Sequence, residues 1–390
     1  MSLHPVHGHQ DLCRSIAAAQ ARDTLPAALL LHGPRGVGKQ RLALWIGQLD
    51  LCEAPSASGP CGTCRSCRMA LRLEHPDVHW FFPLPRPKKA GSPEKMAAAL
   101  EAARFARLDE IRNAPLQSPT VEGATGIYLA AARSLRKRAQ SRPSMSDRQV
   151  FVIGDADSLV PQEASPEAAN ALLKLLEEPP RDTRFILTSS APGSLLDTIR
   201  SRTVPLLVRP LPENDVVDFL VQADIDPEKA RTAARLSGGA IGRALGYLPT
   251  GDEPGPLEQE RRDAFGLLQA ALSEGPGAGF AAGLGRGVTK ARALLGMLGA
   301  LEVWLRDLAA VAAGRPDVVV NADGVPWLTR KASSATIHPA AVAQTLARLD
   351  HAALQARGNV NPQLLVAGLV ADLRLILVPP PTAELPPHVR

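Results

Sequence analysis

A glycine-rich loop between a short apolar run and a helical segment constrains this chain more than any other feature. Residues Ala28 to Leu31 are apolar, as expected of a strand buried in a parallel sheet. They lead into Gly33-Pro34-Arg35-Gly36-Val37-Gly38-Lys39, which has the GxxxxGK spacing of a phosphate-binding loop. The glycines allow backbone N–H groups to surround phosphate oxygens, and Lys39 adds a positive charge. The pattern therefore predicts an α/β nucleotide-binding core.

The stretch from Val150 to Thr203 is typical of the second half of such a core. Two short apolar runs, Val150 to Ile153 and Phe185 to Leu187, predict further buried strands with a helix between them. An acid, Asp155, follows the first run, and a series of hydroxyl residues that includes Ser189 follows the second. Both residues are candidate contacts of a bound nucleotide.

Two positions of this predicted site lack what hydrolysis requires. Lys39 is followed by Gln40, where the pattern needs a Ser or Thr whose hydroxyl holds Mg²⁺ across the β- and γ-phosphates. Proteins of this class that hydrolyse nucleotide place a glutamate directly after the strand-end acid, but Asp155 is followed by Ala156. Asp157, one residue further, is expected to point elsewhere. We therefore expect a site that accepts the phosphates of ATP or ADP but does not hydrolyse them.

Two runs resemble a known family. Asn170-Ala171-Leu172-Leu173-Lys174-Leu175-Leu176-Glu177-Glu178-Pro179-Pro180 and Ser201-Arg202-Thr203 are similar to motifs of the bacterial clamp-loader branch of the AAA+ ATPases. In that family the arginine of an SRC-type motif reaches the γ-phosphate bound by a neighbouring subunit, as an arginine finger. The resemblance implies this role for Arg202, with Ser201 beside it, although Thr203 replaces the cysteine. It also implies that Arg243, in a GxxGRA pattern, is the family's second nucleotide sensor.

A chain with such a finger and an eroded site of its own looks like a non-hydrolysing subunit of the DNA polymerase III clamp loader. The resemblance implies a role in DNA replication, in ATP-driven loading of the sliding clamp onto primed DNA, without intrinsic ATPase activity. The implied partners are the gamma/tau and delta subunits, the clamp, and primer-template DNA bound without sequence preference. Two alternatives stay open, namely an active gamma/tau-like ATPase that tolerates Gln40 and a zinc-dependent DNA-binding or repair factor.

Four closely spaced cysteines predict a metal site. Cys52, Cys61, Cys64 and Cys67 have the spacing CxxxxxxxxCxxCxxC, and four thiolates meet the tetrahedral preference of Zn²⁺. Because four protein ligands leave no open position, the zinc is expected to be structural. An insertion at this point also occurs in the resembled family. The alternative is a redox-active CxxC pair.

The segment Tyr128 to Gln140 predicts a helix with a basic outer face. Its outward residues are expected to be Arg133, Arg136, Lys137 and Arg138. Such a face is either simply solvated or in contact with primer-template phosphates. No groove-reading motif accompanies it, so any contact with DNA is expected to be independent of sequence.

The overall pattern predicts an α/β P-loop (AAA+) domain over residues 1–205, with the zinc knuckle at 52–67 and an insertion of unknown role at 83–126. A helical lid (206–250), an all-α collar for oligomerisation (257–377) and a disordered tail (378–390) are expected to follow. Lys and Arg number 44 against 39 Asp and Glu, which permits a nucleic-acid partner without requiring one. No apolar run approaches the length of a membrane span, and residues 1–10 lack the apolar stretch of a signal peptide. We therefore expect a cytoplasmic protein without a membrane partner.

Overall fold

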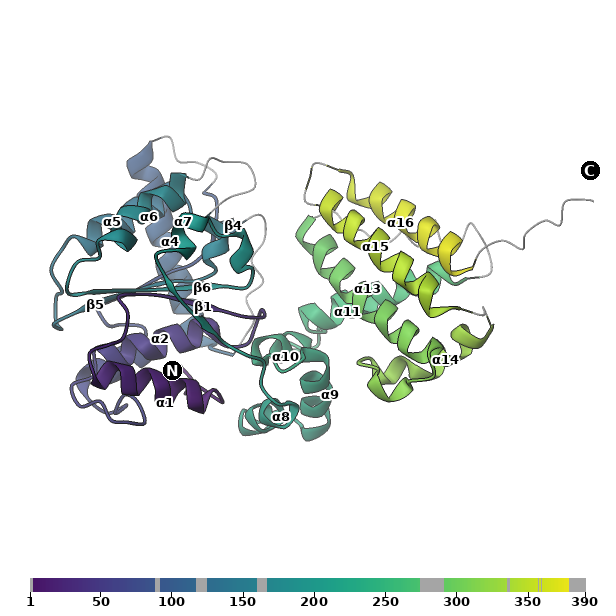
Figure 1. Cartoon of the computed structure of the whole chain (residues 1–390), viewed down its shortest axis with the longest axis horizontal. Coiled ribbons are helices and arrows are strands. Elements are labelled where there is room, and N and C mark those ends of the chain that lie inside the picture. The colour runs from purple at the N-terminus through teal and green to yellow at the C-terminus, as the bar shows by residue number, and fades with distance from the viewer. Residues whose placement is uncertain are drawn as a thin grey trace, which may run out of the picture. The chain divides into compact units, whose positions relative to one another are not determined.

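The computed structural model describes residues 3–87, 92–116, 125–159, 167–273, 291–334, 337–356, 358 and 360–378. The chain divides into two compact units, Met1–Gly246 and Tyr247–Arg390, each with a hydrophobic core of its own (Figure 1). None of the helices in the described ranges has the length and apolar character needed to cross a bilayer.

The first unit is built on a parallel sheet of five strands in the order β2-β5-β6-β1-β7. The strands are β1 (Ala28–His32), β2 (Val78–Phe81), β5 (Gln149–Ile153), β6 (Thr183–Ser189) and β7 (Val204–Leu207). Helices α1 (Gln10–Ala21) and α2 (Lys39–Asp50) cover one face, and α5 (Leu129–Ala139) and α6 (Glu167–Glu177) cover the other (Figure 1). The predicted parallel α/β core is therefore confirmed.

The central strands β1, β5 and β6 are buried along nearly their whole length because both of their faces are covered. Leu30 and Phe185 pack into the cluster on the α5 and α6 side, whereas Leu29, Leu31 and Ile186 pack into the cluster that contains α2. This alternation is the period of two that strand geometry imposes. It also fixes which residues at the strand ends face α2, and α2 carries Lys39.

Strand β7 includes residues 206 and 207, which the sequence pattern had assigned to the lid. It lies at the edge of the sheet and pairs only with β1, so Pro205 removes no hydrogen bond that a second neighbour would need. The lid segment that follows contains α8 (Glu213–Gln222), α9 (Pro227–Ser237) and α10 (Ile241–Tyr247). A short helix, α7 (Asp197–Arg200), precedes β7.

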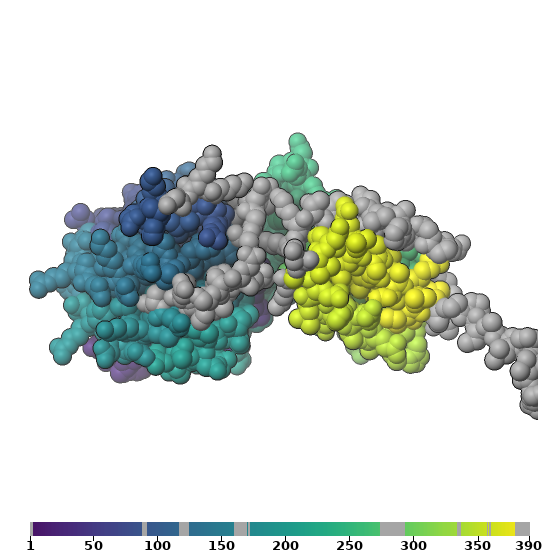
Figure 2. All heavy atoms as spheres, turned by 90° about the horizontal axis from the view of Figure 1, so that it is seen from above, coloured from purple at the N-terminus to yellow at the C-terminus, as the bar shows by residue number. Residues whose placement is uncertain are grey.

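The predicted insertion contains a long helix, α4 (Pro93–Asn113), between the short strands β3 (Leu84–Pro85) and β4 (Thr125–Gly126). Figure 2 shows the blue segment that includes α4 on the surface of the first unit. Arg112 of α4 donates to the carbonyl oxygens of Arg72 and Leu73, at 2.9 and 2.6 Å, just after α3 (Arg65–Leu71). The insertion is thereby fastened to the cysteine-rich segment. Residues 88–91 and 117–124 of the insertion lie outside the described ranges.

The second unit is helical, as its alanine and leucine pattern predicts. It comprises α11 (Pro256–Ala271), α13 (Ala291–Ala312), α14 (Val325–Ser334), α15 (Pro339–Ala356) and α16 (Pro362–Leu377). The predicted tail lies outside the described residues beyond Val378.

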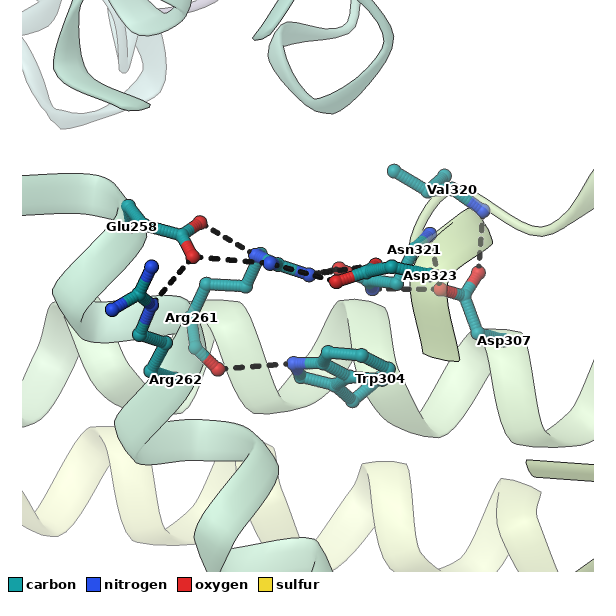
Figure 3. A network of polar contacts seen from close by, with 8 residues as sticks. All are labelled: Glu258, Arg261, Arg262, Trp304, Asp307, Val320, Asn321 and Asp323. Carbon is teal, nitrogen blue, oxygen red and sulfur yellow. Dashed lines mark hydrogen bonds and ion pairs between the residues drawn. The ribbon is translucent and has the colours of Figure 1, made fainter. Parts of the chain in front are cut away.

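A polar network fixes the connection between α13 and α14 (Figure 3). Arg261 bridges Glu258 and Asp323, and Trp304 donates its indole N–H to the Arg261 carbonyl at 3.1 Å. The Asp307 carboxylate accepts the backbone N–H groups of residues 320 and 321, each at 2.9 Å. These bonds satisfy backbone groups in a segment that has no regular ladder.

Candidate functional site

The phosphate loop has the backbone that only glycine adopts readily. Gly36 and Gly38 have φ of 82° and 97°, and Gly38 is the N-cap residue directly before α2. A Cβ added to Gly33 would lie 2.1 Å from the carbonyl oxygen of Val208, and one added to Gly36 would lie 2.8 Å from the backbone nitrogen of Arg243. The predicted GxxxxGK loop therefore forms, and close packing as well as backbone conformation requires its glycines.

The Lys39 side chain is buried and hydrogen-bonded within the protein. Its ammonium group donates to the carbonyl oxygens of Gly33 and Pro34 at 2.9 and 2.8 Å, and to the Ser190 hydroxyl at 2.9 Å. Since an ammonium group has three N–H bonds, the protein itself satisfies all of them. Burial lowers the pKa of Lys39, while Asp155 and Asp157 oppose this shift.

Asp155 and Gln40 meet at the carboxyl end of β5. Asp155 has φ of 48°, and its backbone N–H donates to the Thr188 hydroxyl at 3.0 Å. Burial raises the pKa of the Asp155 carboxyl and nearby Asp157 raises it further, whereas a hydrogen bond with Gln40 is among the contacts that lower it. A Cβ added to Gly154 would lie 2.7 Å from the Gln40 side-chain oxygen. Gln40 thus fills the space between α2 and the end of β5.

Asp157 lies close enough to Lys39 and Asp155 to raise the pKa of both groups. One expectation about this site needs correction. Ser189 is not the hydroxyl that faces the loop: it is fully buried, and its Oγ accepts the N–H of Ala191 at 3.0 Å. The loop contact belongs to Ser190, because strand alternation turns residues 186, 188 and 190 towards α2 and turns Ser189 to the opposite face.

The segment predicted as the lid and the N-terminal segment both contact the GxxxxGK loop. The N–H of Gly242 donates to the Gly36 carbonyl at 2.8 Å, which brings the start of α10, and the backbone of Arg243, against the loop. On another side, His9 Nε2 lies 3.0 Å from the Val37 carbonyl oxygen. His9 belongs to a histidine-rich N-terminal segment, but its contact with the loop depends on a left-handed backbone (φ 56°) that the sequence pattern does not indicate.

Arg202 lies apart from the phosphate loop, between α7 and β7. It forms an ion pair with Glu177, the last residue of α6, and donates to the Thr198 carbonyl at 2.8 Å. Ser201 donates to the same carbonyl at 3.3 Å. The Arg202 side chain remains 31% exposed, and within the described part of the chain no hydrogen bond joins it to the loop. The candidate residues therefore fall into two separate places.

The four cysteines converge as predicted. Their sulfur atoms all lie within 4.8 Å of one another, and Cys61 and Cys67 are 3.9 Å apart. Four sulfurs at about 2.3 Å from a tetrahedral zinc ion are about 3.8 Å apart, so the residues fit this metal. Backbone N–H groups of Cys64 and Thr63 lower the pKa of Cys61 to about 6, which favours the thiolate form that binds metal.

The basic face of α5 is narrower than predicted. Arg133, Arg136 and Lys137 are exposed. Arg138 is half-buried instead, and its guanidinium lies 3.4 Å from the Glu101 carboxylate of α4. The insertion helix covers this end of α5, which could not be foreseen from the pattern of α5 alone.

A parallel sheet with a GxxxxGK loop after its first strand defines a P-loop α/β protein. The family model described as "DNA polymerase III, delta subunit" matches residues 8–212, and the chain belongs to this family.

The relatives agree with the predicted resemblance. The DNA polymerase III subunit delta' of Pseudomonas aeruginosa is 34% identical over 217 residues, which cover 55% of this chain and 53% of the relative. The subunit gamma/tau of Mycobacterium tuberculosis is 28% identical over 211 residues, 54% of this chain and 29% of the relative. A gamma subunit-related protein of Thermotoga maritima aligns over 94% of this chain and 99% of its own, at 14% identity and a TM-score of 0.42. The chain spans about half the length of the delta' relatives that it matches.

Proposed function

We propose that this protein is a delta'-type subunit of a DNA polymerase III clamp loader. In this role it donates Arg202 to the nucleotide site of an adjoining subunit and does not hydrolyse ATP itself. It thereby supports the ATP-driven loading of a sliding clamp onto primed DNA. Membership of the delta family and the similarity to delta' subunits support the assignment.

The state of the phosphate loop is the observation that carries the proposal. All three N–H bonds of Lys39 are used by the protein, and Gln40 is engaged with Asp155 where a magnesium-binding hydroxyl is required. The residue that follows Asp155 is a buried alanine, so no carboxylate is available there to orient water. A nucleotide phosphate would have to displace Ser190 or a loop carbonyl before it could reach Lys39.

Turnover in the assembled loader tests the proposal. An arginine finger is worth about 10³–10⁵ in rate, so Arg202→Ala is expected to slow ATP hydrolysis by an active gamma/tau-type partner about a thousandfold or more at the site that it faces. The isolated chain is expected to show no turnover, with or without Lys39→Ala. Unchanged hydrolysis in loaders that carry Arg202→Ala would refute the finger.

An active ATPase of the gamma/tau type is the second candidate, because the glycines and Lys39 of the loop are retained and a gamma/tau relative aligns with 54% of the chain. ATP hydrolysis by the purified chain that disappears in Lys39→Ala would favour it. A zinc-dependent DNA-binding factor would instead lose DNA binding on removal of zinc while the α/β core stayed folded.

The remaining partners are part of the same proposal. We expect the helical second unit to act as the collar that joins gamma/tau and delta subunits. Arg133, Arg136 and Lys137 are the residues available for sequence-independent contact with DNA phosphates, because they are exposed and no ion pair among the described residues involves them. Zinc is proposed as a structural ion of the four cysteines.

A further inference from the structure

The residue that holds Arg202 stands in an unfavourable place for a carboxylate. Glu177 is the last residue of α6, where the exposed carbonyl groups make the end of the helix negative. A carboxylate there is destabilising by itself, and Pro179 and Pro180 already end the helix. The ion pair with Arg202 compensates for the unfavourable position. The capping of α6 therefore does not explain why a glutamate stands at position 177, whereas the ion pair with Arg202 does.

The Arg202 guanidinium is held by two elements at once. Nη2 is paired with Glu177 on α6, and Nη1 donates to the Thr198 carbonyl of α7 at 2.8 Å. Nη1 also lies 3.3 Å from the Ser201 hydroxyl. The Nε atom is buried and has no hydrogen-bond partner among the described residues. The arginine is thus held at both terminal nitrogens, while its side chain as a whole remains 31% exposed.

Each terminal nitrogen of a guanidinium carries two N–H bonds. One bond from each nitrogen accounts for the anchors on Glu177 and Thr198, and the second bond of Nη1 is directed to the Ser201 hydroxyl. This leaves one N–H bond of Nη2 for an incoming anion. Such a preordered donor needs no reorganisation when charge develops on a phosphate, and this is the condition under which electrostatic catalysis is strongest.

We infer that Glu177 is the positioning residue of Arg202 and that it holds the guanidinium ready for the phosphate of a nucleotide bound by an adjoining subunit. The inference rests on the finger role proposed above. The inference gives the end of the Leu-Leu-Glu-Glu-Pro-Pro run a role in the nucleotide site of an adjoining subunit. The nucleotide site of this chain does not involve that role.

The test measures ATP hydrolysis by the complete loader with its clamp and primed DNA, at varied ATP concentration. With Glu177→Ala we expect kcat to fall about three- to tenfold, the factor gained when one flexible side chain is ordered in advance, with little change in KM. Glu178→Ala is the matched control. It removes the adjacent exposed carboxylate at the same helix end, which has no ion pair among the described residues, and is expected to leave kcat unchanged.

Two further variants separate positioning from structure. Glu177→Gln keeps an oxygen acceptor of the same length without the charge, and its kcat is expected to lie between those of the wild type and Glu177→Ala. In a loader that already carries Arg202→Ala, Glu177→Ala is expected to cause no further loss, because its effect acts through the arginine. A role limited to the folding of α6 would lower kcat equally in both backgrounds.

The outcomes distinguish this inference from the function beneath it. If Arg202→Ala leaves turnover unchanged, the finger itself is refuted. If Arg202→Ala slows turnover but Glu177→Ala and Glu177→Gln match the wild type, the finger stands and the positioning role is refuted. Faster turnover with Glu177→Ala would also overturn the inference, since the carboxylate would then restrain the arginine. If Glu177→Ala impairs folding, the isosteric Glu177→Gln variant is measured instead. Full activity of Glu177→Gln would then refute the positioning role of Glu177.

Discussion

A buried ion pair at the amino-terminal edge of the parallel sheet gives the strongest prediction about stability. Asp50, at the end of α2, pairs with Arg184 of β6, and their side chains are 0% and 4% exposed. Arg184 also donates to the carbonyl oxygens of Leu25 and Pro26 and to the Gln20 side chain. This arginine therefore joins β6 to α2 and to the segment that enters β1.

Replacing Asp50 by alanine leaves the Arg184 guanidinium buried without its counter-charge. Breaking a buried pair in this way destabilises a protein by about 3–5 kcal/mol. For a unit of this size, about 2–4 °C of melting temperature corresponds to each kcal/mol, so the first unit is expected to melt about 6–20 °C lower. The matched control is Asp11→Ala, whose partner Arg14 is 68% exposed, and it is expected to change stability by less than about 1 kcal/mol.

The assay must follow the first unit separately from the helical one. Amide hydrogen exchange in β1 and β6 under native conditions reports the free energy of opening of that sheet. A double variant, Asp50→Leu with Arg184→Met, removes both charges and is expected to recover most of the loss. A deficit of about 1–3 kcal/mol should remain, because the carbonyls of Leu25 and Pro26 lose their donor. If Asp50→Ala opens no more easily than Asp11→Ala, the argument from burial is refuted.

Two further predictions concern pH and metal. Burial lowers the pKa of His79 to about 4, with the positive charges of Arg138 and Arg104 adding to the shift. Between pH 6.5 and pH 4 the unfolded chain therefore binds a proton at His79 that the native state does not. The free energy of unfolding is expected to fall as the pH falls through this range, by at most about 3 kcal/mol. His79→Gln is expected to flatten the dependence of unfolding free energy on pH in this range; an unchanged slope would count against it. The protein as purified is expected to contain one zinc ion per chain by atomic absorption. Cys64→Ser is expected to lower both the zinc content and the melting temperature. The control Cys13→Ser is expected to change neither the zinc content nor the fold. Full zinc content in Cys64→Ser would contradict the four-cysteine site.

Elements with a strong local pattern were predictable from the sequence. The strands predicted from Ala28, Val150 and Phe185 form, and their observed ends lie within two residues of the predicted ones. In the insertion, Pro93 occupies the first turn of α4, as is typical of helix starts. In each case the structure follows from a feature within a few neighbouring residues. This feature is the spacing of the apolar residues, a proline in the first turn of a helix, or a glycine after a strand.

Features that depend on distant residues could not be predicted in the same way. The choice of Ser190 over Ser189 follows from the phase of β6, and that phase is set by which side of the sheet α2 covers. The edge strand β7 has only one neighbour and contains a proline, so its own residues give a weak signal. Arg138 was expected on the outward face of its helix. Its partial burial could not be predicted because its partner Glu101 lies on an insertion helix whose position no local pattern indicates.

Lys39 and Arg202 differ in exposure and in hydrogen bonding, and the family motifs alone do not reveal this difference. Both are cations at positions that the motifs assign to phosphate, yet Lys39 is 5% exposed with every N–H bond satisfied, whereas the Arg202 side chain is 31% exposed and anchored along one side. A phosphate that approaches Lys39 must break bonds within the protein, and Gln40 offers no hydroxyl for the magnesium that would compensate. Arg202 keeps one N–H bond, on Nη2, that none of the described residues accepts. On the proposed function, this unit therefore binds nucleotide poorly at its own loop and offers Arg202 to the site of an adjoining subunit.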